Sequence, residues 1–188
     1  MIIVEGPDNS GKSTLIKNLA KDFKLRTLKC SRHGPPIDGN DNYQRTQEII
    51  ERALKFPDNN IIVDRISLIG EEIYGPILRG KNLWVEYPEK KRNLWNSLRC
   101  LNTFFIYCRP PNNKVLDLST HELKKYDTKE HVLSVSINKD LIVNTYDNYF
   151  AFWEGNYNFF KYDYTNPVDY QQLKYRLKEY LDGKHFRY

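Results

Sequence analysis

Eight residues near the amino terminus have the types and spacing of a loop that binds phosphate groups. Residues 6–13 read GPDNSGKS and match G-x-x-x-x-G-K-[ST] at every fixed position. In such a loop the backbone N–H groups converge on phosphate oxygens, the lysine reaches the β- and γ-phosphates, and the serine hydroxyl coordinates a bridging Mg²⁺. We therefore expect ATP and Mg²⁺ as cofactors, with Lys12 catalytic and Ser13 a metal ligand. The nucleotide-binding residues predicted by the loop are Gly6, Asp8, Asn9, Ser10, Gly11, Lys12, Ser13 and Thr14.

An acid and an arginine that follow a second apolar segment would complete the same chemistry. Residues 61–63 are Ile-Ile-Val, which is typical of a strand buried on both faces, and Asp64 and Arg65 come directly after them. A carboxylate at the end of such a strand would lie near the metal ion and its water shell, and the arginine would point into the phosphate cleft. We predict that Asp64 binds Mg²⁺, partly through water, and that both residues act in catalysis.

Apolar runs and helical periodicities alternate along the chain and supply the elements that must position these residues. Continuous apolar runs predict five strands, over 1–4, 25–30, 61–64, 104–108 and 159–164. Helical spacing predicts helices over 12–23, 43–54, 67–74, 86–100, 138–153 and 168–181, the third of which is interrupted at Gly75-Pro76. Residues 112–136 are polar with weak periodicity, and we predict a helix that runs into a mobile lid. The alternation indicates an α/β fold, a three-layer α/β/α P-loop NTPase fold with a five-stranded parallel sheet, in a single domain over 1–188.

The composition restricts the class of protein. Hydrophobic residues make up 40% of the 188 residues and charged residues 28%, so a core is available and disorder is not the default. The longest apolar runs fall short of the roughly 20 residues that cross a bilayer, and no secretory signal is visible, so we expect a cytoplasmic protein. The net charge of +5 arises from interleaved basic and acidic residues, which indicates a solvated surface with some preference for anionic ligands.

The cysteines and histidines do not have the spacing of metal ligands. Cys30, Cys100 and Cys108 lack CxxC spacing, so we expect buried, reduced thiols. The four histidines form no HExxH pair, so no zinc site is predicted. Any metal should arrive with a substrate.

The sequence resembles the thymidylate kinase family of P-loop nucleoside monophosphate kinases, in the short form encoded by phages. Residues 4–14, VEGPDNSGKST, are similar to the family's EGxDGxGKST, and Asp64-Arg65 with Tyr74 downstream is similar to its DR-x-x-x-S-x-x-AYQ segment. Residues 73–80 and 105–111 look like the phage-type forms. The match covers nearly the whole chain in order, and its most specific motif is the phosphate loop.

The resemblance implies a kinase that transfers the γ-phosphoryl group of ATP to a deoxynucleoside monophosphate, dTMP or a related one. It implies that Asp8 contacts the acceptor's sugar hydroxyl or the metal environment and acts in catalysis, and that Arg65 holds the acceptor phosphate. Arg32, His33 and Tyr74 complete the implied substrate site. It also implies a homodimer. The family's turn glutamate is replaced by His33, a loop glycine by Asn9 and a base-reading glutamine by Gly75, which leaves the base specificity open.

Two other activities stay open from the residues. A kinase of the same fold that phosphorylates a hydroxyl, on a nucleoside or on a hydroxymethylated pyrimidine in DNA, would need a nearby base, and residues 25–36 contain no carboxylate. DNA would then be a partner. A nucleotide-binding regulatory ATPase with no small-molecule acceptor is the third hypothesis. Secondary candidates for phosphate contacts are Arg45, Arg79, Arg109 and the lysines Lys124, Lys125 and Lys129, each of which could equally be a plain surface residue. The aromatic residues of 146–160 are better explained by core packing than by base stacking.

Overall fold

The computed structural model describes residues 1–29, 36–55, 60–115 and 129–183. Five strands form one sheet in the order β2-β3-β1-β4-β5, and all of its pairings are parallel. The strands are β1 (Ile2–Glu5), β2 (Arg26–Leu28), β3 (Ile61–Asp64), β4 (Phe104–Cys108) and β5 (Phe159–Tyr162). The predicted five-stranded parallel sheet is thereby confirmed.

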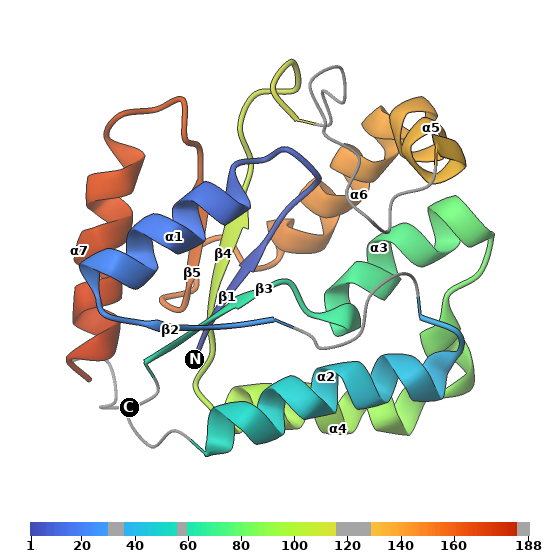
Figure 1. The fold of residues 1–188 in the computed structure, drawn as a ribbon, viewed down its shortest axis with the longest axis horizontal. Coiled ribbons are helices and arrows are strands. Elements are labelled where there is room, and N and C mark those ends of the chain that lie inside the picture. Colours follow the sequence, from blue (N-terminus) through green and yellow to red (C-terminus); the bar gives the residue numbers. More distant parts are fainter. Residues whose placement is uncertain (30–35, 56–59, 116–128, 184–188) are drawn as a thin grey trace.

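Helices cover both faces of this sheet (Figure 1). They are α1 (Lys12–Asp22), α2 (Gly39–Leu54), α3 (Ser67–Arg79), α4 (Pro88–Cys100), α5 (Lys129–Ile137), α6 (Lys139–Ala151) and α7 (Asp169–Leu181), with a 3₁₀ turn η1 (Leu83–Glu86) before α4. Successive strand residues point to opposite faces. Ile2 and Val4 therefore pack with α1 and α7, while Ile3 and Val63 pack with α2, α3, α4 and α6. These two cores confirm the three-layer α/β/α architecture.

The helix predicted to stop at Gly75-Pro76 was placed wrongly. In the structure α3 continues to Arg79 and ends at Gly80, whose φ of 68° is left-handed. Proline removes one helical hydrogen bond, but the apolar face of α3 is deeply buried, with Ile73 at 0% exposure, and this packing holds the helix together. Gly75 is needed because a Cβ there would collide with the Glu71 carboxylate.

Other boundaries differ by a few residues. The second helix begins at Gly39 rather than at residue 43, because the Asp38 side chain accepts a hydrogen bond from the Asp41 N–H at 2.7 Å and caps it. Of the predicted lid, residues 116–128 lie outside the described part, and α5 covers 129–137. Cys108 is buried as expected, but Cys100 is exposed, since it ends α4 on its solvent side, and Cys30 lies outside the described residues. Among the described helices none is long and apolar enough to span a membrane.

Candidate functional site

The phosphate loop joins the end of β1 to the start of α1, as the motif predicts. Its backbone is left-handed at Asn9 (φ 57°) and Gly11 (φ 84°), and Gly6 has a φ of 142°. Gly6 is required for space as well, since a Cβ there would lie 2.5 Å from the carbonyl oxygen of Cys108 at the end of β4. Asparagine is among the residues that best tolerate a left-handed backbone, which fits Asn9 to this position of the loop.

Lys12 is folded against its own loop. Its side chain is 8% exposed, and its Nζ donates to the Pro7 carbonyl and to Ser10 Oγ, the latter at 3.3 Å. Burial, together with the nearby charge of Arg65, lowers the pKa of Lys12 to about 8, against the opposing charge of Asp8. The ammonium group is thus held at the amino terminus of α1, where it would contact the oxygens of a bound phosphate.

Arg65 reaches from the end of β3 back to the phosphate loop. Its own backbone is left-handed, with a φ of 62°, and its N–H donates to the Val4 carbonyl at 3.1 Å. The guanidinium donates to the Gly6 carbonyl at 2.7 Å and pairs with Asp8 Oδ1 at 3.0 Å. It also lies over the Tyr74 ring, 5.6 Å from its centre. The structure therefore brings together Asp8, Arg65 and Tyr74, three of the predicted site residues.

Glu5, to which the sequence analysis gave no role, lies beneath these residues. Its carboxyl group is fully buried, and Oε1 accepts a hydrogen bond from the Ile66 N–H at 2.8 Å. Burial raises the pKa of Glu5 to about 7, against the opposing charges of Arg65 and Lys12. An acidic residue that ends an apolar strand directly before the glycine loop is the signal that could have marked it.

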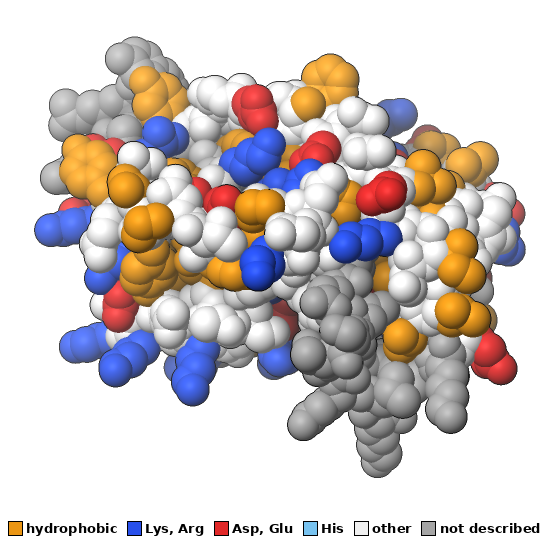
Figure 2. Space-filling model, turned by 90° about the horizontal axis from the view of Figure 1, so that it is seen from above, with side chains coloured by type: hydrophobic (Ala, Val, Ile, Leu, Met, Phe, Trp, Pro, Cys, Tyr) orange, Lys and Arg blue, Asp and Glu red, His pale blue; other side chains and the backbone are white. Residues whose placement is uncertain are grey.

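Two buried polar atoms of this cluster have no hydrogen-bond partner among the described residues. They are Oε2 of Glu5 and Nε of Arg65. Buried polar atoms are almost always paired, so a water molecule or a polar ligand would complete the network at these two atoms. Figure 2 shows the molecule from the side of the carboxyl-terminal strand ends. Basic and acidic side chains lie next to each other near the middle of this face.

Ser13 and Asp64 have the oxygen atoms that Mg²⁺ requires. Ser13 is exposed on the first turn of α1, and Asp64 is half-buried at the end of β3, where it pairs in register with Val4 of β1. Asp64 Oδ2 also lies 3.7 Å from Lys29 Nζ. A hydroxyl and a carboxylate on neighbouring elements beside the phosphate loop fit a Mg²⁺ ion that keeps several of its waters.

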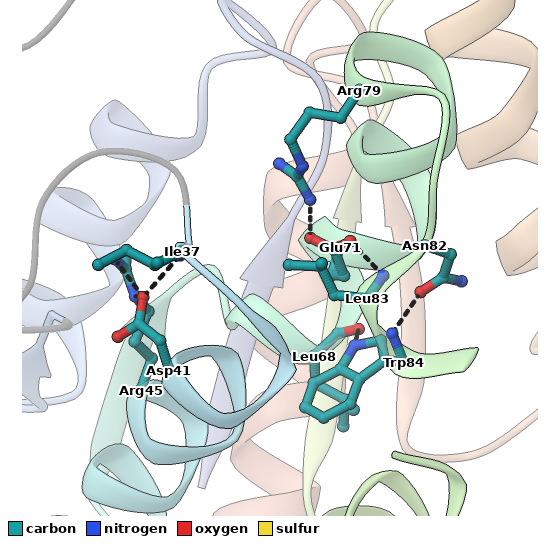
Figure 3. Close-up of polar contacts among 9 residues, drawn as sticks. All are labelled: Ile37, Asp41, Arg45, Leu68, Glu71, Arg79, Asn82, Leu83 and Trp84. Atoms are coloured by element: carbon teal, nitrogen blue, oxygen red, sulfur yellow. Dashed lines mark hydrogen bonds and ion pairs between the residues drawn. The ribbon is translucent and has the colours of Figure 1, made fainter. Parts of the chain in front are cut away.

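The secondary arginines are held by carboxylates. Arg45 pairs with Asp41 at 2.8 Å in α2, and Arg79 pairs with Glu71 in α3 (Figure 3). Arg109, at the end of β4, pairs with Asp147 at 2.8 Å. Arg32, His33, Lys124 and Lys125 lie outside the described residues, as does the side chain of Lys129. The aromatic residues Tyr146, Phe150 and Phe159 are buried in the core, whereas Tyr157 is 67% exposed.

Tyr164 is a further residue that the sequence analysis missed. It follows β5, and its ring lies against the phosphate loop, because a Cβ on Gly11 would be 2.8 Å from its Cδ1. It was predicted as the last residue of the strand over 159–164, and its place at a strand end on the side of the loop is the signal that could have marked it. An aromatic side chain that is 41% exposed beside the loop is suited to contact a bound nucleotide.

Comparisons with known proteins identify the fold. No protein-family model matches the chain. A curated cytidylate kinase of Clostridioides difficile is 34% identical over 84 residues, which is 39% of this chain and 38% of that enzyme's length. The chain thus matches about two fifths of this relative.

Two solved structures align over almost the full length. One is the YorR protein of Bacillus subtilis in complex with phosphorylated GDP, with a TM-score of 0.66, 16% identity and 99% of both chains covered. The other is deoxyadenosine kinase from M. mycoides with bound dATP, with a TM-score of 0.64, 15% identity and coverage of 94% of this chain and 98% of that one. The chain shares its fold with these two proteins.

Proposed function

We propose that the protein is an ATP-dependent kinase that phosphorylates a deoxynucleoside monophosphate, dTMP or a related one. The observation that supports this most is the contact of Arg65 with the phosphate loop, 2.7 Å from the Gly6 carbonyl and 3.0 Å from Asp8. An arginine from the neighbouring strand stands beside the loop that would hold the γ-phosphate. It is therefore suited to bind an acceptor phosphate and to stabilise the charge that develops during transfer.

Each residue of the site has a role under this proposal. The loop amides and Lys12 bind the β- and γ-phosphates, and Lys12 exchanges its contact with the Pro7 carbonyl for a phosphate oxygen. Ser13 and Asp64 would hold Mg²⁺, which supplies neutralisation of the phosphate charge. Arg65 orients the acceptor phosphate, and Asp8 fixes the guanidinium. A phosphate acceptor is already anionic, so this transfer needs no general base.

A nucleoside hydroxyl is the second candidate acceptor. The buried Glu5 favours it, since its Oε2 has no hydrogen-bond partner in the described part of the chain. A hydroxyl acceptor needs a carboxylate within about 3 Å to take its proton. The fold shared with a deoxyadenosine kinase agrees with such an acceptor. The carboxylate that the segment over 25–36 lacks would then come from β1.

An acceptor panel tests the proposal. Purified protein is incubated with ATP, Mg²⁺ and each deoxynucleoside monophosphate, each nucleoside or a hydroxymethylpyrimidine DNA duplex, and ADP release is measured. We expect stimulation by at least one monophosphate. Stimulation by nucleosides or DNA alone would refute the monophosphate acceptor and favour a hydroxyl acceptor. ATP turnover that no acceptor changes would favour the regulatory ATPase.

Two variants serve as controls for this panel. Lys12→Ala should abolish ADP release with every acceptor. Arg65→Ala should lower kcat/KM for a monophosphate by about a hundredfold, the loss typical of one transition-state donor. Equal activity of Arg65→Ala and the native protein would refute the role of this arginine. The homodimer implied by the resemblance is a separate prediction, which sedimentation of the same protein measures.

A further inference from the structure

A pocket of about 460 Å³ lies at the amino-terminal ends of β4 and β5. The phosphate loop lies at the other end of the sheet, where the strands finish. Its lining residues come from the ends of α4 and α6 and from the segments that lead into β4 and β5. Strand β4 begins here at Phe104 and ends beside Gly6, so the sheet separates the pocket from the site described above. The volume is within the range of small-molecule sites, roughly 300 to 1,000 Å³.

Aromatic rings form one wall of the pocket. Trp95 and Trp153 have ring centres 5.9 Å apart, and Phe105 lies 4.8 Å from Trp153. These contacts fix the rings, so that the wall is preformed. Phe152 stands at the rim and is 94% exposed. A wall of tryptophan with an exposed phenylalanine at its edge is suited to stack against a flat ring.

Two asparagines on the same pocket present a fixed donor and acceptor. Asn158 Nδ2 donates to Asn102 Oδ1 at 2.6 Å, which leaves Asn102 Nδ2 as a donor and Asn158 Oδ1 as an acceptor without hydrogen bonds to any described residue. The backbone carbonyl of Asn102 accepts from the Tyr180 hydroxyl at 2.7 Å, and that of Asn158 accepts from the Phe105 N–H at 2.8 Å. A neighbouring donor and acceptor match the hydrogen-bonding edge of a nucleobase.

Arg99 adds a cation to this pocket. It is exposed on the last turn of α4, and within the described part of the chain its guanidinium has neither an ion pair nor a hydrogen bond. Guanidinium groups bind phosphate by charge-assisted hydrogen bonds. We propose that the pocket is a second nucleotide site, with the base against Trp95 and Trp153, its edge on Asn102 and Asn158, and the phosphate at Arg99.

Fluorescence titration with AMP tests this site, since two of the three tryptophans line it and the third, Trp84, is only 2% exposed. The titration is made in a Lys12→Ala/Arg65→Ala background, which disables the phosphate-loop site. We expect AMP to quench the emission in this background as in the native protein. Phe152→Ala and Arg99→Gln should each raise the Kd at least about fivefold, the lower end of the effect of losing one stacking contact.

Matched controls use exposed residues outside the pocket. Val85→Ala and Arg92→Gln, the latter on the same helix as Arg99, should leave the Kd unchanged. The site is refuted if AMP binding disappears in the Lys12→Ala/Arg65→Ala background, or if neither pocket variant weakens it. Ribose 5-phosphate should bind far more weakly than AMP, and equal binding would show an anion site without base recognition. The result does not depend on whether the acceptor panel detects kinase activity.

Discussion

The Oε1 atom of Glu5 accepts a hydrogen bond from the backbone N–H of Ile66 at 2.8 Å, although the two residues are 61 positions apart. This bond joins the residue before the phosphate loop to the residue after Arg65. It sets the end of β3 against the end of β1, so that Arg65 is directed toward the loop. A fully buried carboxyl group thus has a structural role directly below the proposed site of phosphoryl transfer.

Glu5 should make the stability of the protein depend on pH. Its pKa is raised by burial from 4.5 to about 7, so between these values the folded state holds a proton that the unfolded state has lost. The stabilisation from the neutral carboxyl is therefore complete below about pH 4.5 and is lost as the pH rises through 7. We expect Glu5→Gln, measured by urea unfolding, to gain about 3 kcal/mol relative to the native protein between about pH 4.5 and pH 8.

An exposed carboxylate provides the control for this measurement. Glu154, whose side chain is 61% exposed, can be changed to Gln in the same way. The free energy of unfolding of Glu154→Gln should follow that of the native protein across the same pH range. A Glu5→Gln profile parallel to the native one would show that Glu5 titrates as an ordinary surface carboxyl.

Arg65 should prefer glycine to alanine as a replacement. Its φ of 62° costs about 1 kcal/mol for any residue with a Cβ. Arg65→Gly and Arg65→Ala should both lose acceptor-dependent turnover. In urea titrations we expect the free energy of unfolding of the glycine variant to be about 1 kcal/mol higher than that of the alanine variant.

The same pair of substitutions at an ordinary helical position should give the opposite order. Glu51 is exposed in the last turn of α2, and glycine is up to about 1 kcal/mol less favourable than alanine in a helix. Glu51→Ala should therefore be the more stable variant of that pair. If alanine were also the better replacement at position 65, the left-handed backbone would not be a constraint in solution.

Local sequence signals were sufficient for the phosphate loop and for the fold. The loop motif, the apolar run before it and the helical spacing after it all lie within 23 residues, and each element was found where it was expected. Asp64 and Arg65 were placed at the end of a strand for the same reason, and β3 does end at Asp64. The parallel sheet followed from the alternation of strands and helices.

The features that the sequence analysis missed depend on contacts between distant residues. The role of Glu5 rests on Ile66, and Arg109 is held by Asp147, 38 positions away. Helix α3 passes through Pro76 because tertiary packing outweighs the local preference for a break. No periodicity in the sequence contains this information.

Lys12 should carry a stability cost for its function. The residue is only 8% exposed, and burial chiefly lowers its pKa from 10.5 to about 8, so the charged form is destabilised in the folded state. Lys12→Met keeps the aliphatic stem and removes the buried charge. At about pH 7 we expect this variant to lose phosphoryl transfer. Its free energy of unfolding should be roughly 1 to 3 kcal/mol higher than that of the native protein.

Lys17, exposed on the same helix, is the matched control. Lys17→Met should change neither activity nor the free energy of unfolding by more than about 0.5 kcal/mol. A destabilised Lys12→Met would show that the bonds from Nζ to Pro7 and Ser10 outweigh the cost of burying the charge.

Gly11 should be intolerant of alanine for two separable reasons. Its φ is 84°, and an added Cβ would lie 2.8 Å from Cδ1 of Tyr164. Gly155 has a similar φ of 88° but no atom within 4 Å of an added Cβ, so Gly155→Ala measures the backbone cost alone, about 1 kcal/mol. Gly11→Ala should be the more destabilising of the two in urea unfolding. Adding Tyr164→Ala to Gly11→Ala should remove the additional destabilisation, because the ring that the Cβ would collide with is gone. We expect a coupling energy between the two substitutions of about 1 kcal/mol or more. A coupling energy of zero would mean that the ring does not pack against the phosphate loop in solution.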